Sequence, residues 1–238
     1  MRDRLKLVSP NIVVEPHIAS EGSAFYLEPQ MDDTLVIVIA QSGTTIDTNI
    51  YVQMAKDRGA MTLAIANKRQ GDVTFIVDGT LYIGEGRDIE VAVPSTKTYT
   101  AQVIVGYILT LFFLSQKKLI DKNFDSFKSD LHQLLLMPKT IQKSLKILSV
   151  KEKYKNSLNQ FYKFNSWYIV TDNSDNSVCA NEIRIKLSEN CYQSIPYLDI
   201  SYLSNLNLSN SFLTVVSNNK IRNYSDILIK ILKSNNFI

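Results

Sequence analysis

The sequence contains few of the residues that form disulfide frameworks and metal sites. Its 238 residues include two cysteines, Cys179 and Cys191, and two histidines, His17 and His132. Two cysteines are too few and too loosely spaced for a disulfide framework or a zinc site. Such sparing use of cysteine is typical of a reduced, cytoplasmic protein, and no metal site is implied.

Nucleotide-binding glycine patterns are also missing. The chain has eight glycines, and none of them precedes the Lys-Ser/Thr pair of a P-loop or completes the three-glycine fingerprint of a dinucleotide site. ATP and NAD are therefore not the expected ligands, and the sequence implies no organic cofactor.

Charge of one sign is not concentrated anywhere in the chain. The formal net charge is +3, with basic and acidic residues interspersed, so the sequence offers no basic stripe for nucleic acid. Residues 1–4 are mostly charged, and no apolar segment of a secretion signal follows them. The longest apolar run, Val103–Leu114, is shorter than the ~20 residues that a membrane span requires, and we predict a buried helix there.

The most informative stretch is Thr34–Thr48. It begins with the apolar run Leu35–Ala40, which predicts a strand covered on both faces. The small polar loop Gln41–Thr45 follows, and the amphipathic segment Ile46–Arg58 predicts a helix that ends at Gly59. Free N–H groups at a helix start, together with hydroxyl groups, form an anion site, so phosphate is the expected ligand. An ordinary strand–helix turn with a threonine cap is the alternative.

Further apolar segments predict an α/β fold. Met61–Ala66 indicates a second buried strand, and Val73–Val77 and Leu81–Ile83 are shorter apolar segments separated by a turn. Strands alternating with helices indicate a parallel sheet with helices on both faces. Because ligands bind at the carboxyl ends of such strands, we expect Gln41–Thr45 and Ser95–Lys97 at the same edge of the sheet.

The C-terminal half repeats this alternation of strands and helices. The spacing of apolar residues predicts a helix over Phe124–Val150, which Pro138 should break or kink. A charged helix over Lys151–Phe164 is predicted to connect it to the following unit. That unit is predicted to contain the strands Trp167–Val170 and Phe212–Val216 and the helices Val178–Asn190 and Ser225–Lys233.

Two motifs resemble those of the sugar isomerase (SIS) domain family. Residues 40–48, AQSGTTIDT, resemble the family pattern S-Q-S-G-E-T-x-D-T, and residues 93–102, VPSTKTYTAQ, resemble V-A-S-T-K-x-F-T-x-Q. The likeness is greatest to the isomerase half of glucosamine-6-phosphate synthase and to related amino-sugar isomerases and deaminases. It implies a three-layer, flavodoxin-like parallel-sheet α/β domain over residues 1–122, a helical linker over 123–164 and a second, incomplete SIS-like repeat over 165–238.

The resemblance implies that both motifs bind a sugar phosphate. Within the first motif, Gly43 would permit close backbone approach, while Ala40 replaces a family serine and Thr44 a family glutamate. Losing one hydroxyl costs ~1 kcal/mol of binding, which the site should tolerate. A helix cap at Ser95 and Thr96 is the alternative role for the second motif, and both roles can hold at once. The residues implied in substrate binding are Gln41, Ser42, Gly43, Thr44, Thr45, Val93, Ser95, Thr96 and Lys97.

The predicted second repeat carries a candidate catalytic face. Residues 181–189, NEIRIKLSE, resemble the family segment E-G-A-L-K-L-K-E, whose final glutamate moves the proton. Glu182, Lys186 and Glu189 fall at i, i+4 and i+7 on one helical face. The resemblance implies that Glu189 is the catalytic carboxylate and that Glu182 is its partner near the sugar. An exposed, salt-bridged helix is equally compatible with this pattern.

Other parts of the family machinery have no counterpart in this sequence. Residues 202–207, YLSNLN, replace the family loop E-L-K-H-G-P and lack its histidine. The lysine-bearing tail and the amidotransferase domain are missing too, so the chain is not expected to release ammonia from glutamine. The chain is shorter than family members at both ends, which would fit a gene fragment or a remnant.

The resemblance thus implies a cytoplasmic homodimer that binds a hexose or hexosamine 6-phosphate in amino-sugar metabolism. As an enzyme, the protein would be an aldose–ketose isomerase or an amino-sugar deaminase acting through Glu189. A non-catalytic sugar-phosphate sensor, a partner subunit and a decayed fragment of such an enzyme remain as alternatives. No nucleic acid, membrane, metal ion or organic cofactor is implied.

Overall fold

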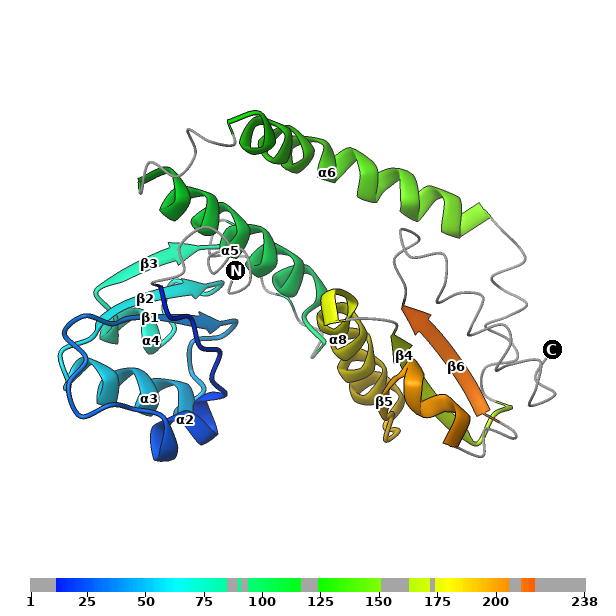
Figure 1. Ribbon diagram of the computed structural model, residues 1–238, viewed down its shortest axis with the longest axis horizontal. Coiled ribbons are helices and arrows are strands. Elements are labelled where there is room, and N and C mark those ends of the chain that lie inside the picture. The colour runs from blue at the N-terminus through cyan, green and yellow to red at the C-terminus, as the bar shows by residue number, and fades with distance from the viewer. Residues whose placement is uncertain are drawn as a thin grey trace. The chain divides into compact units, whose positions relative to one another are not determined.

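The computed structural model describes residues 12–84, 90, 94–116, 124–150, 163–171, 174–205 and 211–216. The chain divides into two compact units, Met1–Lys139 and Thr140–Ile238. Figure 1 shows a parallel sheet with helices in each unit. The limits predicted from the sequence, residues 1–122, 123–164 and 165–238, stay predictions.

The first unit contains a three-stranded parallel sheet. Its strands, β1 (Leu35–Ala40), β2 (Met61–Ala66) and β3 (Gly79–Tyr82), lie in the order β1-β2-β3. Ala40 pairs with Ala66, so the carboxyl ends of β1 and β2 are level. Both strand pairs are parallel, which confirms the predicted sheet.

Helices cover both faces of this sheet. They are α2 (Ala19–Phe25), α3 (Ile46–Lys56), α4 (Val73–Ile76) and α5 (Thr96–Gln116). On one face, the buried side chains of Val38 and Ala64 pack with residues of α3 and α4. On the other face, Ile65 packs with Leu109 of α5. Burial on both faces is why β2 has no polar side in the sequence.

The structure shows what two segments noted in the sequence form: the segment after the polar loop and the short apolar segment Val73–Val77. The helix after the polar loop is confirmed, and Gly59 follows its end with a φ of +94°, a conformation that glycine adopts readily. The short apolar segment Val73–Val77, to which the sequence assigned no element, contains one helical turn, Val73–Ile76. The N–H of Thr74 donates to the carbonyl of Gly71 at 2.9 Å, and this local bond starts the turn.

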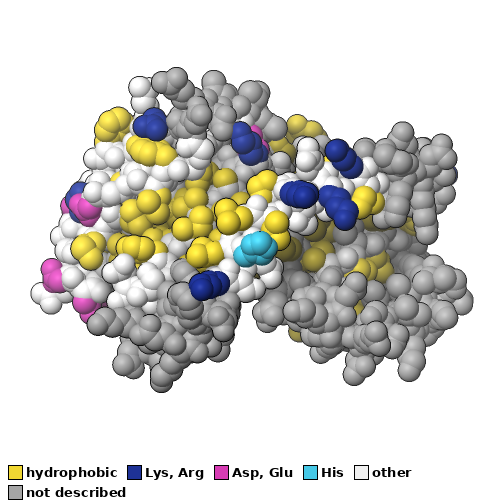
Figure 2. Space-filling model, turned by 90° about the horizontal axis from the view of Figure 1, so that it is seen from above, with side chains coloured by type: hydrophobic (Ala, Val, Ile, Leu, Met, Phe, Trp, Pro, Cys, Tyr) yellow, Lys and Arg dark blue, Asp and Glu magenta, His cyan; other side chains and the backbone are white. Residues whose placement is uncertain are grey.

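The prediction of a buried helix over Val103–Leu114 is wrong for the single chain. α5 buries four side chains, Leu109 among them, whereas Val103, Ile108 and Phe112 are about half exposed. Ala101, Val105, Leu109 and Phe113 pack toward the sheet, and the exposed apolar positions are spread around the rest of the helix. By length and composition alone α5 could also cross a membrane, but the core helix of a globular protein passes the same test. Figure 2 shows hydrophobic side chains gathered on the face seen from above.

The long helix α6 (Phe124–Val150) crosses the division between the two units. It runs without a break through Pro138, so the predicted break is absent. Its described side chains are largely exposed, including those of Leu135 at 80% and Leu145 at 61%.

The second unit contains another three-stranded parallel sheet, in the order β5-β4-β6. Both predicted strands of this unit are confirmed, and the predicted helix at Val178 begins four residues earlier, at Ser174. The strand β5 and the 3-10 helix η1 were not predicted. The elements are β4 (Ser166–Thr171), α8 (Ser174–Cys191), β5 (Tyr197–Asp199), η1 (Ile200–Asn205) and β6 (Ser211–Val216).

Two predicted helices are not tested by the structure. Ser225–Lys233 lies outside the described residues, and so does Lys151–Phe164 apart from its last two positions. The idea that the second unit is an incomplete repeat of the first therefore stays a prediction.

Candidate functional site

The loop that follows β1 has its own internal hydrogen bonds. The Oγ atom of Ser42 accepts a hydrogen bond from the hydroxyl of Thr44 at 3.0 Å and another from the N–H of Thr44 at 3.3 Å. Gly43 is buried and has a φ of +72°, which glycine adopts at little steric cost. Ser42 and Gly43 thus set the shape of the loop, while Thr44 and Thr45 remain exposed.

A second loop, after β2, supports the first one by direct backbone contact. A Cβ atom added to Gly71 would collide with the carbonyl oxygen of Ser42, and one added to Gly43 would lie 2.9 Å from the Cα of Gly71. The N–H of Val73 donates to the carbonyl of Gly43 at 2.9 Å. The sequence interpretation missed Gly71, whose only signal is a glycine in a polar turn after a buried strand.

The first turn of α3 is not closed by its own cap residue. Within the described part of the chain, Thr45 has extended backbone angles and makes no side-chain capping hydrogen bond. The first N–H groups of a helix have no partners inside the helix, and the helix dipole makes this end positive. Together with the hydroxyl groups of Ser42 and Thr44, this end of α3 is chemically suited to a phosphate.

The first turn of α5, by contrast, is closed by a carboxylate of the same chain. Glu90 accepts hydrogen bonds from the N–H of Lys97 at 2.8 Å and the N–H of Thr98 at 2.9 Å, one on each oxygen. Ser95, just before the helix, has a φ of +48°. Desolvation raises the pKa of Glu90, but hydrogen bonds from Thr98 and Lys97 outweigh it, so the pKa lies below its usual value. Val93 lies outside the described residues.

The described residues of both motifs lie at one edge of the sheet. The N–H of Asn67 donates to the carbonyl of Ala40 at 3.3 Å, where β1 leads into its loop. Asn67, which is 4% exposed, also lines a cavity of about 50 Å³ together with Glu90 and Lys97. The carboxyl ends of β1 and β2 thus bring the two segments to the same edge, as expected for a parallel sheet.

A carboxylate at the opposite end of the sheet has a structural role. Asp78 accepts hydrogen bonds from the N–H and the hydroxyl of Thr62 at 2.9 and 2.7 Å, and Lys56 Nζ lies 2.7 Å from its other oxygen. The contact with Lys56, followed by the bonds from Thr62, lowers the pKa of Asp78 to about 2. This cluster ties the end of α3 to the amino ends of β2 and β3, away from the two motifs.

The candidate catalytic residues share one face of α8, in the second unit. Lys186 Nζ lies 3.3 Å from an oxygen of Glu182 and 3.5 Å from an oxygen of Glu189. The exposed fractions of these side chains are 21% for Lys186, 19% for Glu182 and 34% for Glu189. The geometry is compatible with a proton-transfer group and with an ion-paired structural helix, so both interpretations stay open.

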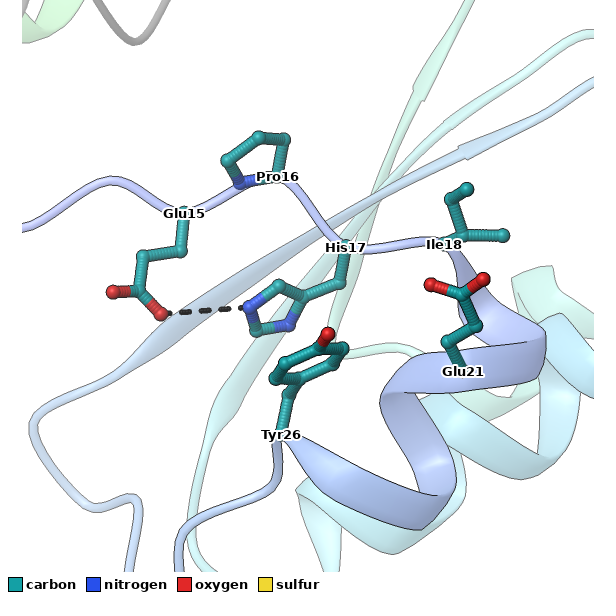
Figure 3. Close-up of a pocket in the computed structure, with 6 residues that line it drawn as sticks. All are labelled: Glu15, Pro16, His17, Ile18, Glu21 and Tyr26. Atoms are coloured by element: carbon teal, nitrogen blue, oxygen red, sulfur yellow. Dashed lines mark ion pairs between the residues drawn. The ribbon is translucent and has the colours of Figure 1, made fainter.

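A larger hollow lies at the N-terminal side of the first unit. Figure 3 shows the imidazole of His17 between the carboxylate of Glu15 and the ring of Tyr26. Nδ1 of His17 lies 2.8 Å from the hydroxyl of Tyr51 in α3, and Nε2 lies 3.5 Å from Glu15. Both ring nitrogens thus face side chains of the chain itself, so His17 holds this segment against α3. The cavity, of about 430 Å³, is lined by Glu15, Pro16, His17, Ile18, Glu21 and Tyr26.

Comparison with known sequences gives one family and a set of longer relatives. Residues 5–112 match the SIS domain family. The chain is 38% identical over 148 residues to a glutamine–fructose-6-phosphate aminotransferase (isomerizing) of Fusobacterium nucleatum, which covers 61% of this chain and 24% of the relative. It is 36% identical over 183 residues to the protein of the same name from Clostridium acetobutylicum, covering 76% of this chain and 28% of the relative. The chain therefore spans about a quarter of the length of these relatives.

Solved structures share the fold of the chain at low sequence identity. The C-terminal domain of glucosamine-fructose-6-phosphate aminotransferase from Francisella tularensis matches with a TM-score of 0.80 and 19% identity, over 98% of this chain and 64% of that one. Glucosamine-6-phosphate deaminase from Thermotoga maritima matches with a TM-score of 0.61 and 14% identity, over 90% and 61%. These matches confirm the α/β fold.

Proposed function

We propose that the chain, whose residues 5–112 match the SIS domain family, binds a hexose or hexosamine 6-phosphate through the loop Gln41–Thr45. The observation that carries the proposal is the contrast between two helix starts at one sheet edge. Among the described residues, the first turn of α3 has no side-chain cap from Thr45 and lies beside the hydroxyl groups of Ser42 and Thr44, whereas the first turn of α5 already holds Glu90. The helix dipole attracts a phosphate to the first, whose turn also carries the exposed Asp47, whereas Glu90 already occupies N–H donors of the second. The sugar then extends from its phosphate toward Ser95–Lys97.

For the activity, we propose aldose–ketose isomerisation or deamination of an amino sugar phosphate. Glu189 moves a proton between adjacent carbons, and Glu182 and Lys186 act as its partners. The names of the relatives, an isomerizing aminotransferase and a deaminase, support this chemistry. A non-catalytic sensor or partner subunit is the second candidate, and residues 202–207 favour it because they lack the family's histidine loop.

For the assembly, we propose a homodimer in the cytoplasm. The support is the apolar helix α5, on which Val103, Ile108 and Phe112 are about half exposed. A helix that is hydrophobic all round is normally buried, and a second copy of the chain would provide that burial.

The test combines ligand binding with turnover. Calorimetric titration with inorganic phosphate, fructose 6-phosphate and glucosamine 6-phosphate measures binding, and a coupled assay measures conversion. Conversion that is lost in Glu189→Gln while binding is kept supports the enzyme. Binding by the native chain without any conversion supports the sensor. Failure of all three compounds to bind contradicts the sugar-phosphate site itself.

A further inference from the structure

The carboxylate of Glu90 occupies a place where an open helix start would otherwise attract an anion. We propose that Glu90 is an internal anion that positions the start of α5 and restricts the ligand to a single phosphate. This inference rests on the proposed sugar-phosphate site, and it assigns to that site a specificity-determining residue outside both sequence motifs.

The positioning role follows from the hydrogen bonds of Glu90. Its two oxygens each hold one backbone N–H, at 2.8 Å for Lys97 and 2.9 Å for Thr98. The Thr98 side chain also donates to Glu90 and is 4% exposed, so the carboxylate is bound to a buried part of the helix. Ser95 keeps a φ of +48°, and a non-glycine residue remains in that region only when its surroundings hold it there. Glu90 binds the N–H groups two and three positions beyond Ser95.

The specificity role follows from the charge of Glu90. A phosphoryl group placed at the start of α5 would have to displace an ionised carboxylate from two N–H donors. The cavity beside it, of about 50 Å³, is lined by Asn67, Lys97 and Glu90. Lys97 already interacts with Glu90 electrostatically, so its charge is partly compensated. A neutral hydroxyl meets none of this repulsion, whereas like charges at close range disfavour a ligand strongly.

The experiment compares two sugar phosphates that differ by one phosphoryl group. Calorimetry measures the affinities of the full chain for fructose 6-phosphate and fructose 1,6-bisphosphate. The native chain is expected to bind the monophosphate about tenfold more tightly. The repulsion between the Glu90 carboxylate and a second phosphate changes the affinity by about that factor. Glu90→Gln keeps the shape of the side chain without its charge and should bring the ratio of the two affinities close to one. Glu90→Asp, which keeps the charge, should retain the preference.

Two further variants separate specificity from loss of structure. Thr98→Val removes one donor to Glu90 and leaves its charge, so it should lower the melting temperature without changing the affinity ratio. Asp78→Asn weakens the opposite end of the sheet and should also leave the ratio unchanged. A native ratio near one, or an unchanged ratio in Glu90→Gln, overturns the inference and leaves the proposed function standing. If the native chain binds neither sugar phosphate, the proposed function fails and the inference fails with it.

Discussion

Gly43 and Gly71 touch backbone to backbone, so that a Cβ atom on Gly43 would lie 2.9 Å from the Cα of Gly71. The loops after β1 and β2 therefore support each other without an intervening side chain. This contact holds the carbonyl of Ser42 and the start of α3 in place. The shape of the proposed phosphate loop depends on a residue that lies 28 positions further along the chain.

Gly71→Ala should deform this loop. The new methyl group collides with the carbonyl oxygen of Ser42, and such overpacking costs about 1–3 kcal/mol of unfolding free energy. Sugar-phosphate affinity should fall together with stability, as measured by calorimetry and urea denaturation. Gly106→Ala is the matched control, because a Cβ atom there meets nothing within 4 Å. The control should gain ~0.5–1 kcal/mol of stability in the helix; equal behaviour of the two variants would contradict the role of Gly71.

Ser42→Ala should weaken the binding of inorganic phosphate and fructose 6-phosphate alike. Its Oγ atom accepts two hydrogen bonds from Thr44, and its loss removes both the local bonds and a hydroxyl from the proposed site. One hydrogen bond contributes ~0.5–1.5 kcal/mol, so the affinity should fall roughly two- to tenfold. Titration calorimetry provides the measurement, with Ser115→Ala in the last turn of α5 as the control. If Ser42→Ala binds phosphate as tightly as the native chain, the phosphate does not bind at this loop.

The free energy of unfolding should fall in acid, because Asp78 becomes protonated and loses its contacts with Lys56 and Thr62. Its pKa in the folded protein is about 2, below the ordinary 3.8, so its stabilising contribution is present above about pH 4 and is lost as the pH falls toward 2. The depressed pKa of Glu90 acts in the same direction. Urea denaturation at a series of pH values should show a smaller acid loss in Asp78→Asn than in the native chain. If the stability of the two proteins falls equally with pH, Asp78 does not contribute to the loss of stability in acid.

Phe112→Glu should separate the proposed dimer. Phe112 is 54% exposed on the apolar helix α5, and a charge buried between two copies would be strongly unfavourable. Sedimentation velocity should show a dimer for the native chain and a shift toward monomer for the variant. Phe25→Glu is the control, since Phe25 is 80% exposed on α2 and lies outside the proposed contact. A native chain that sediments as a monomer would exclude the dimer.

The parts of the fold that sequence could predict are those fixed by local pattern. The continuous apolar run Leu35–Ala40 predicted the strand β1 correctly, but its predicted burial on both faces is wrong, since Leu35 is 38% and Ile39 63% exposed. The glycine after a basic turn, Gly59, correctly marked the end of α3. The form of Val73–Ile76 could not be predicted, because a four-residue apolar segment has no periodicity that separates a strand from one helical turn. The burial of α5 was overestimated because apolar composition alone does not show which of its side chains a neighbouring element covers.

The candidate site was predictable only in part, because two of its supports are contacts between distant loops. The loop Gln41–Thr45 and the segment Ser95–Lys97 could be predicted from motifs and parallel topology. Gly71 could not, since its importance arises from the approach of another backbone. Glu90 could not either, because nothing local to it indicates that its carboxylate binds the first turn of a helix that starts six positions later.

The position of β1 has a consequence for regulation. Within the described sheet, β1 is the outermost strand of the order β1-β2-β3, and it is also the strand that ends in Gln41–Thr45. Ile39, next to that end, is 63% exposed. Any polypeptide that hydrogen-bonds along the outer edge of β1 would affect the conformation of the loop Gln41–Thr45. Recruitment of such a polypeptide and uptake of the small molecule would then be linked, each changing the affinity for the other by the same factor.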